Sequence, residues 1–274
     1  MLQFRSELQL SDLAKPSQRD VLTTVKAFLE WCSDTAQVIE PIASLRKRGT
    51  GIKVSSKKFI RIWKDDAVND LFATVVDDTK KRLFYLLMLN TGAYESDIGT
   101  WTKHAVDDKG RKYKTFDKSA KTIRFKRHKE KDEPDVPTVT YRLWDETYEL
   151  LLQHESSHPE LLFTTSVNTC LWRSDLNEET RKRRAKNMIG KQYRDLRDSL
   201  EKKDWGTLED LRKTAVSKLD DHGEYARYSQ HFAGHSPKGT TSRFYIKPSQ
   251  IQFDNAVMWL GEQFGFRSTG RSQL

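Results

Sequence analysis

Two short segments near the C-terminus limit the possible fold and chemistry of this chain more than any other feature. The first reads Leu208-Glu-Asp-Leu-Arg-Lys-Thr-Ala215, and the second reads Phe232-Ala-Gly-His-Ser-Pro-Lys-Gly-Thr-Thr-Ser-Arg-Phe-Tyr245. They offer, in this order, Arg212, His235 and Tyr245. A guanidinium matches two phosphate oxygens, an imidazole exchanges protons, and an activated phenol is a nucleophile. Together these residue types suit attack on a phosphodiester.

The charge balance indicates a polyanionic partner. The chain has 274 residues, with 48 Lys and Arg against 39 Asp and Glu, so its formal net charge is +9. A basic protein of this kind most simply binds nucleic acid; the alternative is a domain that is basic without such a partner. The length fits one large domain, or a domain plus part of another.

Cysteine usage and hydropathy indicate an intracellular protein. Cys32 and Cys170 lie far apart and suggest neither a disulfide framework nor a CxxC metal site. A reducing, cytoplasmic location is the expected default. No apolar run approaches the roughly 20 residues of a membrane span, and the polar N-terminus shows no secretory signal. We therefore expect no membrane partner.

The spacing of apolar residues predicts a mostly α chain with a small antiparallel β-sheet, an α+β fold. The predicted strands are 121–127 and 136–143, joined by a charged hairpin tip over 126–134. The predicted helices are 20–33, 67–76, 79–89, 145–154, 178–203 (one helix or a pair), 209–219, 225–233 and 249–264.

A basic, glycine-broken connector over 45–52 separates a short N-terminal part from the rest. We expect a partial N-terminal helical segment and linker over 1–50, and the main domain over 51–274. The run Arg181-Lys-Arg-Arg184 is either a solvated helix face or a patch that faces DNA.

Three segments resemble the motifs of the tyrosine recombinases, or phage-integrase family. Residues 208–215 resemble the family's LR-H/K-T helix start, and residues 232–245 resemble its GH-x-x-x-x-T-T segment. Leu86-Leu-Met-Leu-Asn-Thr-Gly-Ala-Tyr-Glu-Ser-Asp-Ile98 is similar to its LLxxTGLRxSEL box in the apolar helix, the Thr-Gly and the Ser-Asp-Ile. The resemblance covers residues 57–264 and implies the family's catalytic domain. Residues 20–50 resemble only the tail of its core-binding domain, so we expect a fragment or a shortened member.

The resemblance assigns the nucleophile and the phosphate clamp. Tyr245 is the candidate nucleophile, although in many members the tyrosine would fall one position earlier, at Phe244. Arg212 would clamp the phosphate oxygens; the alternative is a surface salt bridge with Glu209 or Asp210.

The remaining roles are also implied by the resemblance. His235 would hydrogen-bond the scissile phosphate or assist proton transfer, and Gly234 before it allows close backbone approach. Lys129 would be the general acid at the hairpin tip, with Lys126 and Lys131 as neighbours able to replace it. The expected DNA contacts are Lys126, Lys131, Arg127, Lys213, Lys238 and Arg243.

Two positions depart from the family pattern. Tyr94 stands where the first box normally carries an arginine, and Glu209 stands where the second box normally carries a histidine. A lost preorganised charge of this kind typically removes about 3–4 kcal/mol of transition-state stabilisation. Arg82 and Arg61 are the candidates to supply that charge instead.

A competing motif is His154-Glu-Ser-Ser-His158, which has the HExxH pattern of zinc peptidases. That chemistry requires both histidines on one helical face, one turn apart. Pro159 disfavours the α conformation at His158, so the segment reads better as a helix end.

The implied function is site-specific recombination or integration of a phage or mobile element, through a 3′-phosphotyrosyl link. The alternative is a catalytically degenerate relative that only binds DNA. Since the covalent link conserves bond energy, no metal, ATP or other cofactor is implied. The expected partners are duplex DNA, further copies in a homotetramer, and accessory DNA-bending proteins, in a cytoplasmic, nucleoid-associated setting. Residues 255–264 would dock on a neighbouring subunit or pack on their own chain.

Overall fold

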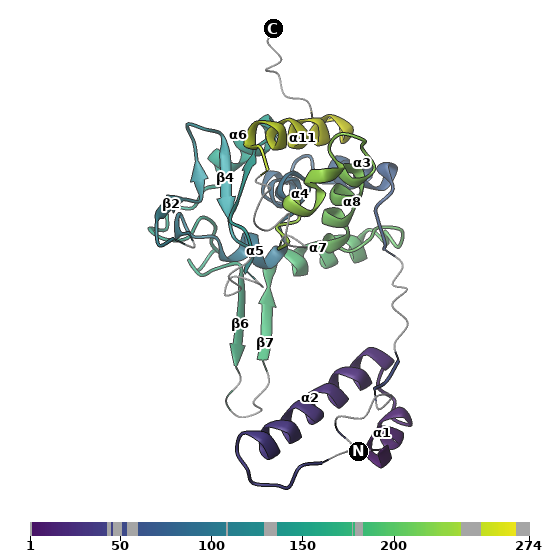
Figure 1. Cartoon of the computed structure of the whole chain (residues 1–274). Coiled ribbons are helices and arrows are strands. Elements are labelled where there is room, and N and C mark those ends of the chain that lie inside the picture. Colours follow the sequence, from purple (N-terminus) through teal and green to yellow (C-terminus); the bar gives the residue numbers. More distant parts are fainter. Residues whose placement is uncertain are drawn as a thin grey trace. The chain divides into compact units, whose positions relative to one another are not determined.

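The computed structural model describes residues 2–42, 45, 51–53, 60–107, 109–128, 136–176, 178, 183–236 and 248–266. The chain divides into two compact units, Met1–Phe59 and Ile60–Leu274 (Figure 1). In the described part of the chain, no helix has both the length and the apolar character needed to cross a membrane.

The first unit is a pair of helices, α1 (Leu2–Gln9) and α2 (Lys15–Asp34), which confirms the helix predicted over 20–33. Its small core consists of Leu8, Leu22 and Ile52, with Phe4 packed against it. Gln18 joins the two helices at their turn, because its amide donates to the carbonyl of Leu13 at 2.9 Å.

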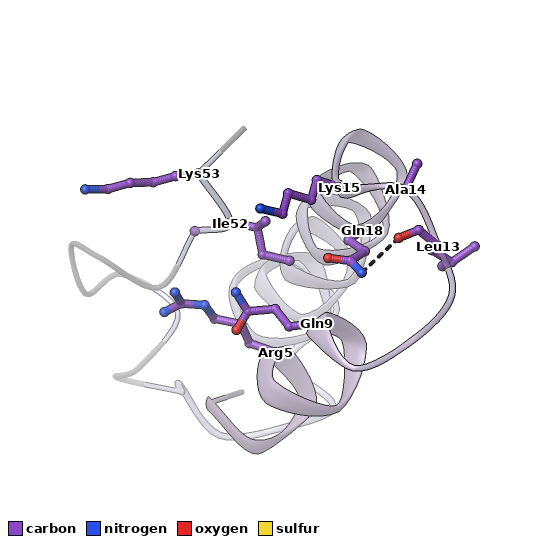
Figure 2. A pocket seen from close by; sticks show the side chains of 9 residues that line it. Arg5, Gln9, Leu13, Ala14, Lys15, Gln18, Ile52 and Lys53 are labelled. Atoms are coloured by element: carbon purple, nitrogen blue, oxygen red, sulfur yellow. Dashed lines mark hydrogen bonds between the residues drawn. The ribbon is translucent and has the colours of Figure 1, made fainter. Parts of the chain in front are cut away.

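A pocket of about 730 Å³ lies in this first unit (Figure 2). Three cationic side chains, Arg5, Lys15 and Lys53, are among the residues that line it. The polar amide of Gln18 faces the same space. The pocket therefore presents positive charge to any anion that approaches this unit.

The second unit is built around α4 (Thr79–Thr91), which is buried along its whole length from Leu83. Helices α6 (Asp145–His154), α8 (Leu208–Asp220) and α11 (Gln250–Gln263) pack directly on it, and α3 (Asp65–Thr74) belongs to the same unit (Figure 1). The helices predicted over 67–76, 79–89, 145–154, 209–219 and 249–264 are confirmed. Helix α4 ends at Gly92, whose φ of 62° is readily adopted by glycine.

The two predicted strands and their antiparallel pairing are also confirmed, while most of the predicted tip over 126–134 lies outside the described residues. Strands β3 (Phe116–Asp117), β4 (Thr122–Phe125) and β5 (Val139–Arg142) form an antiparallel sheet in the order β3-β4-β5. Ile123 pairs with Tyr141 and Phe125 with Val139, and all four side chains are buried. A separate two-stranded sheet joins β1 (His104–Val106) and β2 (Lys112–Lys114).

The prediction of helix over 178–203 was wrong in its first part. Strands β6 (Trp172–Leu176) and β7 (Arg183–Asn187) form an antiparallel hairpin, which Figure 1 shows extending from the helical body of this unit. Helix α7 (Met188–Ser199) begins only after Asn187, whose side chain accepts from the Gly190 amide at 2.9 Å. Cross-strand pairing with β6 outweighs the helical propensity of the charged segment.

Helix α11 packs on its own chain. Phe253, Ala256, Val257 and Leu260 are buried in the main core, and Trp144 Nε1 donates to the Val257 carbonyl at 2.8 Å. Of the two arrangements considered for this segment, the structure has packing in cis. The segment predicted as a helix over 225–233 is a 3₁₀ turn, η2 (Ala226–Tyr228), that continues into a short helix, α9 (Ser229–Phe232).

Candidate active site

Arg212 lies on the buried face of α8 and connects two of the three motif segments. Helix α8 begins with a capping box in which Asp210 accepts from the backbone N–H of Thr207 at 2.9 Å. From the next turn, Arg212 donates through Nη1 to the Gly92 carbonyl and through Nη2 to the Ala233 carbonyl. Its side chain is only 4% exposed. The arginine therefore lies where the segment that begins at Leu86 meets the segment that begins at Phe232.

The alternative of a surface salt bridge does not describe Arg212. The carboxylates of Glu209 and Asp210 instead pair with Lys213, at 3.2 and 2.8 Å. Hydrogen bonds to Asp210 and Glu209 raise the pKa of the Lys213 ammonium, although burial opposes them. Lys213, expected to contact DNA, thus has two carboxylates beside it.

His235, in the segment that begins at Phe232, contacts Arg212. Its Nε2 lies 3.3 Å from Arg212 Nη2, and its Nδ1 lies 3.0 Å from the side-chain oxygen of Gln230. Because Arg212 only donates, this geometry assigns the proton of a neutral His235 to Nδ1, where it faces Gln230. Arg212 and His235, which were predicted separately as site residues, therefore lie next to each other.

The Tyr94 ring contacts two arginines, Arg212 and Arg127. The Tyr94 ring centroid lies 4.6 Å from Arg212 Cζ and 4.8 Å from Arg127 Cζ. Both distances fall within the range of cation–π contact. Arg127 follows strand β4 and is 4% exposed, so it lies in the cluster and not on a solvated tip.

Asp97 fixes the relative position of the segments that carry Tyr94 and Arg127. Its Oδ2 accepts from the Tyr94 backbone N–H at 2.8 Å, and its Oδ1 accepts from the His128 backbone N–H at 2.7 Å. Burial raises the pKa of Asp97, against the opposing effect of those hydrogen bonds and of the two arginine charges. One buried carboxylate thus joins the start of α5 (Glu95–Thr100) to the end of β4.

Two glycines let the backbone approach closely here. A Cβ at Gly92 would lie 2.9 Å from the Phe232 ring, and a Cβ at Gly234 would lie 2.9 Å from Arg127 Cδ. Gly234 also has a φ of 59°. The close approach predicted for Gly234 is therefore real, and the group that approaches it is Arg127.

An acidic pocket of about 440 Å³ borders the cluster, lined in part by Tyr94, His128, Glu95 and Glu209. Burial raises the pKa of Glu95, and the charge of Glu209 acts in the same direction. The two departures from the family motifs, at positions 94 and 209, therefore face the same space.

Several predicted site residues lie outside the described residues: Tyr245 and its alternative Phe244, Lys129, Lys131, Lys238 and Arg243. Their roles stay predictions. Lys126 is described, and it lines a second pocket together with Asp97.

Arg82 does not supply the charge missing at position 94. It is bound to the Glu146 carboxylate and donates to the Phe72 carbonyl at 2.7 Å, between helices of the core. Arg61 is exposed.

The HExxH segment lacks the geometry of a zinc peptidase. Helix α6 ends at His154, so His158 is not on the same helical face. His154 Nε2 lies 2.8 Å from Thr79 Oγ1, and His158 Nδ1 accepts from the Leu161 backbone at 3.0 Å. Within the described part of the chain, no group of three or more His, Cys, Asp or Glu is arranged to hold a metal ion.

Asp97 was not predicted as a site residue, and Arg127 was predicted only as one of several DNA contacts. Asp97 carried a local signal, because an acid three residues after the N-cap residue, here Tyr94, is a capping position. The proximity of Arg127 to Tyr94 had no such signal, since it depends on packing between distant segments.

A scan against protein-family models found no match, and a search of curated proteins found none either. Among solved structures, the chain is similar to the Tn1549 transposon integrase in complex with transposon right-end DNA, at 12% identity over 94% of this chain and 83% of that chain, with a TM-score of 0.59. It is also similar to the integrase from mycobacterium phage Brujita, at 13% identity over 97% of this chain and 79% of that chain, with a TM-score of 0.50. The chain therefore has the fold of the tyrosine recombinases and integrases.

Proposed function

We propose that this protein is a site-specific DNA recombinase or integrase that cuts and rejoins duplex DNA through a 3′-phosphotyrosyl intermediate. The observation that carries the proposal is the contact between Arg212 and His235, which come from two separate motif segments. The integrase-like fold and the net charge of +9 support it further.

In the proposed reaction, the Tyr245 hydroxyl attacks the scissile phosphorus and the bond to the 5′-oxygen breaks. Arg212 stabilises the charge on the phosphate oxygens as the attack proceeds. His235 hydrogen-bonds the phosphate or relays the phenolic proton, and Lys129 protonates the leaving 5′-oxygen. Attack by a 5′-hydroxyl of the partner duplex reverses these steps and releases the tyrosine. The homotetramer on two duplexes stays part of this proposal.

DNA binding has its own support in the charge distribution. The pocket of the first unit gathers Arg5, Lys15 and Lys53. Such groups contact phosphates without reading sequence, and they make binding steeply dependent on salt. We include this pocket among the proposed phosphate contacts.

A second candidate function is DNA binding without cleavage. It is favoured by Tyr94 in place of an arginine and by the carboxylates of Glu95 and Glu209 at the bordering pocket. Such a relative would retain salt-sensitive binding and form no covalent link.

The test is a covalent-trapping assay. The protein is incubated with nicked suicide duplexes from the ends of its own genetic element, and denaturing gels are run for a protein–DNA adduct. Tyr245→Phe and Phe244→Tyr variants run beside the wild type. An adduct that disappears only with Tyr245→Phe supports the recombinase and the register of the nucleophile. Absence of an adduct, with sound binding to the same duplexes, supports the second candidate.

A further inference from the structure

Arg127 and Arg212 are two buried cations that share one aromatic platform. Each guanidinium carbon lies within 5 Å of the Tyr94 ring centroid, at 4.8 and 4.6 Å, and each side chain is 4% exposed. They come from distant parts of the sequence, one after β4 and the other on α8. Such an arrangement concentrates positive charge at a single place.

The two positive charges of Arg127 and Arg212 affect each other. The hydrogen bonds of Arg212 go to the carbonyls of Gly92 and Ala233 and to the imidazole of His235. Burial and the neighbouring Arg127 charge lower the pKa of Arg212. Both arginine charges act on the Asp97 carboxyl, where they oppose the rise in pKa that burial causes. Two guanidinium groups held this close together suit an anion such as phosphate.

Three contacts keep Arg127 in this position. The Asp97 carboxylate accepts from the backbone of the next residue, His128, at 2.7 Å. Gly234 leaves room for the Arg127 side chain, since a Cβ there would lie 2.9 Å from Cδ. Tyr94 provides the ring on which the guanidinium rests. A surface lysine or arginine that makes a nonspecific contact to DNA does not need to be held in one position in this way.

We propose that Arg127 and Arg212 bind one phosphate group together, and that Arg127 is a second catalytic cation of the DNA-cleaving site. This inference rests on the proposed function for the identity of the phosphate, which is the scissile one. It assigns to Tyr94 the role of a positioning residue that holds the pair. Arg127, which follows strand β4, then supplies the positive charge that Tyr94 lacks.

The experiment compares cleavage of two suicide duplexes, one with a normal scissile phosphate and one with a methylphosphonate there. Arg127→Ala should slow adduct formation on the phosphate by roughly 100-fold or more, as expected for a lost preorganised charge. On the methylphosphonate, which lacks one negative charge, the loss should fall to about 10-fold or less. Arg127→Lys should recover part of the rate, because it restores the charge without the planar fork.

Arg82→Ala is the matched control, because Arg82 is also a partly buried core arginine but pairs with Glu146. It should lower the Tm and leave the ratio of the two cleavage rates at the wild-type value. If Arg127→Ala cleaves within about threefold of wild type, or loses the same factor on both duplexes, Arg127 is not a phosphate cation.

A second measurement separates failure of this inference from failure of the proposed function. The Tm of the wild type, Arg127→Ala, Arg212→Ala and Arg82→Ala proteins is measured with and without millimolar inorganic phosphate. The inference predicts a phosphate-dependent rise in Tm that is lost in both Arg127→Ala and Arg212→Ala and kept in Arg82→Ala. If the wild type forms no adduct, this result still supports a two-arginine anion site in a non-cleaving protein. A rise that persists in Arg127→Ala overturns the inference in either case.

Discussion

Gly234 is packed directly against Arg127, with no space for a methyl group between them. A Cβ at Gly234 would lie 2.9 Å from Arg127 Cδ and 3.1 Å from Arg127 Cγ. The glycine of the Gly-His pair therefore positions a side chain from the β-hairpin as well as the histidine that follows it. The motif that looked local in sequence joins two distant parts of the second unit.

Gly234→Ala should therefore reduce DNA cleavage and phosphate binding as well as stability. The substitution strains a backbone with φ of 59° and displaces Arg127. The strain alone should cost about 1 kcal/mol of unfolding free energy. Gly110→Ala is the control, because Gly110 has a φ of 74° with nothing within 4 Å. Denaturant titration should show a loss in both variants. If cleavage falls equally in both, the contact with Arg127 has no functional effect.

Asp97→Asn should destabilise the second unit and disturb the site. Asp97 accepts hydrogen bonds from the backbone N–H groups of Tyr94 and His128. In the variant, one of these N–H groups would face an amide NH₂ in place of an oxygen. Leaving a buried donor unsatisfied costs about 1–3 kcal/mol, measurable by chemical denaturation. Asp117→Asn is the comparison, since Asp117 also accepts backbone hydrogen bonds, at 3.0 and 3.1 Å, but near solvent. Equal losses in the two variants would contradict the role given to Asp97.

The sequence predicts much of this fold because its signals are local. The apolar spacing of α4 and α8 and the alternation of Ile123 and Phe125 each specify one element and its buried face. The segment 183–187 was missed because its strand depends on pairing with β6, a non-local interaction. The motif resemblance named both Arg212 and His235 as site residues. The Arg127–Tyr94 contact could not be predicted in this way, because it depends on the hydrogen bonds by which Asp97 joins the segment after β4 to the start of α5.

Stability should depend on pH through Glu95. Burial, with a contribution from the Glu209 charge, raises the pKa of Glu95 in the folded protein. A carboxyl group with a raised folded pKa stabilises the fold below its unfolded pKa, and this stabilisation is lost as pH rises through the folded value. The Tm of Glu95→Gln relative to wild type should therefore increase from acidic to neutral pH. Glu149→Gln, which removes a carboxyl from an exposed position of α6, is the comparison variant. A Tm difference for Glu95→Gln that does not change with pH would show that its carboxyl is not held in an unfavourable environment.

Glu209→Gln should strengthen DNA binding. The Glu209 carboxylate pairs with Lys213 at 3.2 Å and lies at the pocket beside Tyr94, so it opposes the approach of a phosphate. Removing its charge leaves Lys213 with one carboxylate partner, Asp210 at 2.8 Å, and makes the local field more positive. Affinity for duplex DNA, measured by fluorescence anisotropy across salt concentrations, should rise several-fold at low salt and converge with wild type at high salt. Glu149→Gln removes the same charge from an exposed position on α6 and should change the affinity less. Equal gains in the two variants would mean that net charge alone, and not the position of Glu209, controls the approach of DNA.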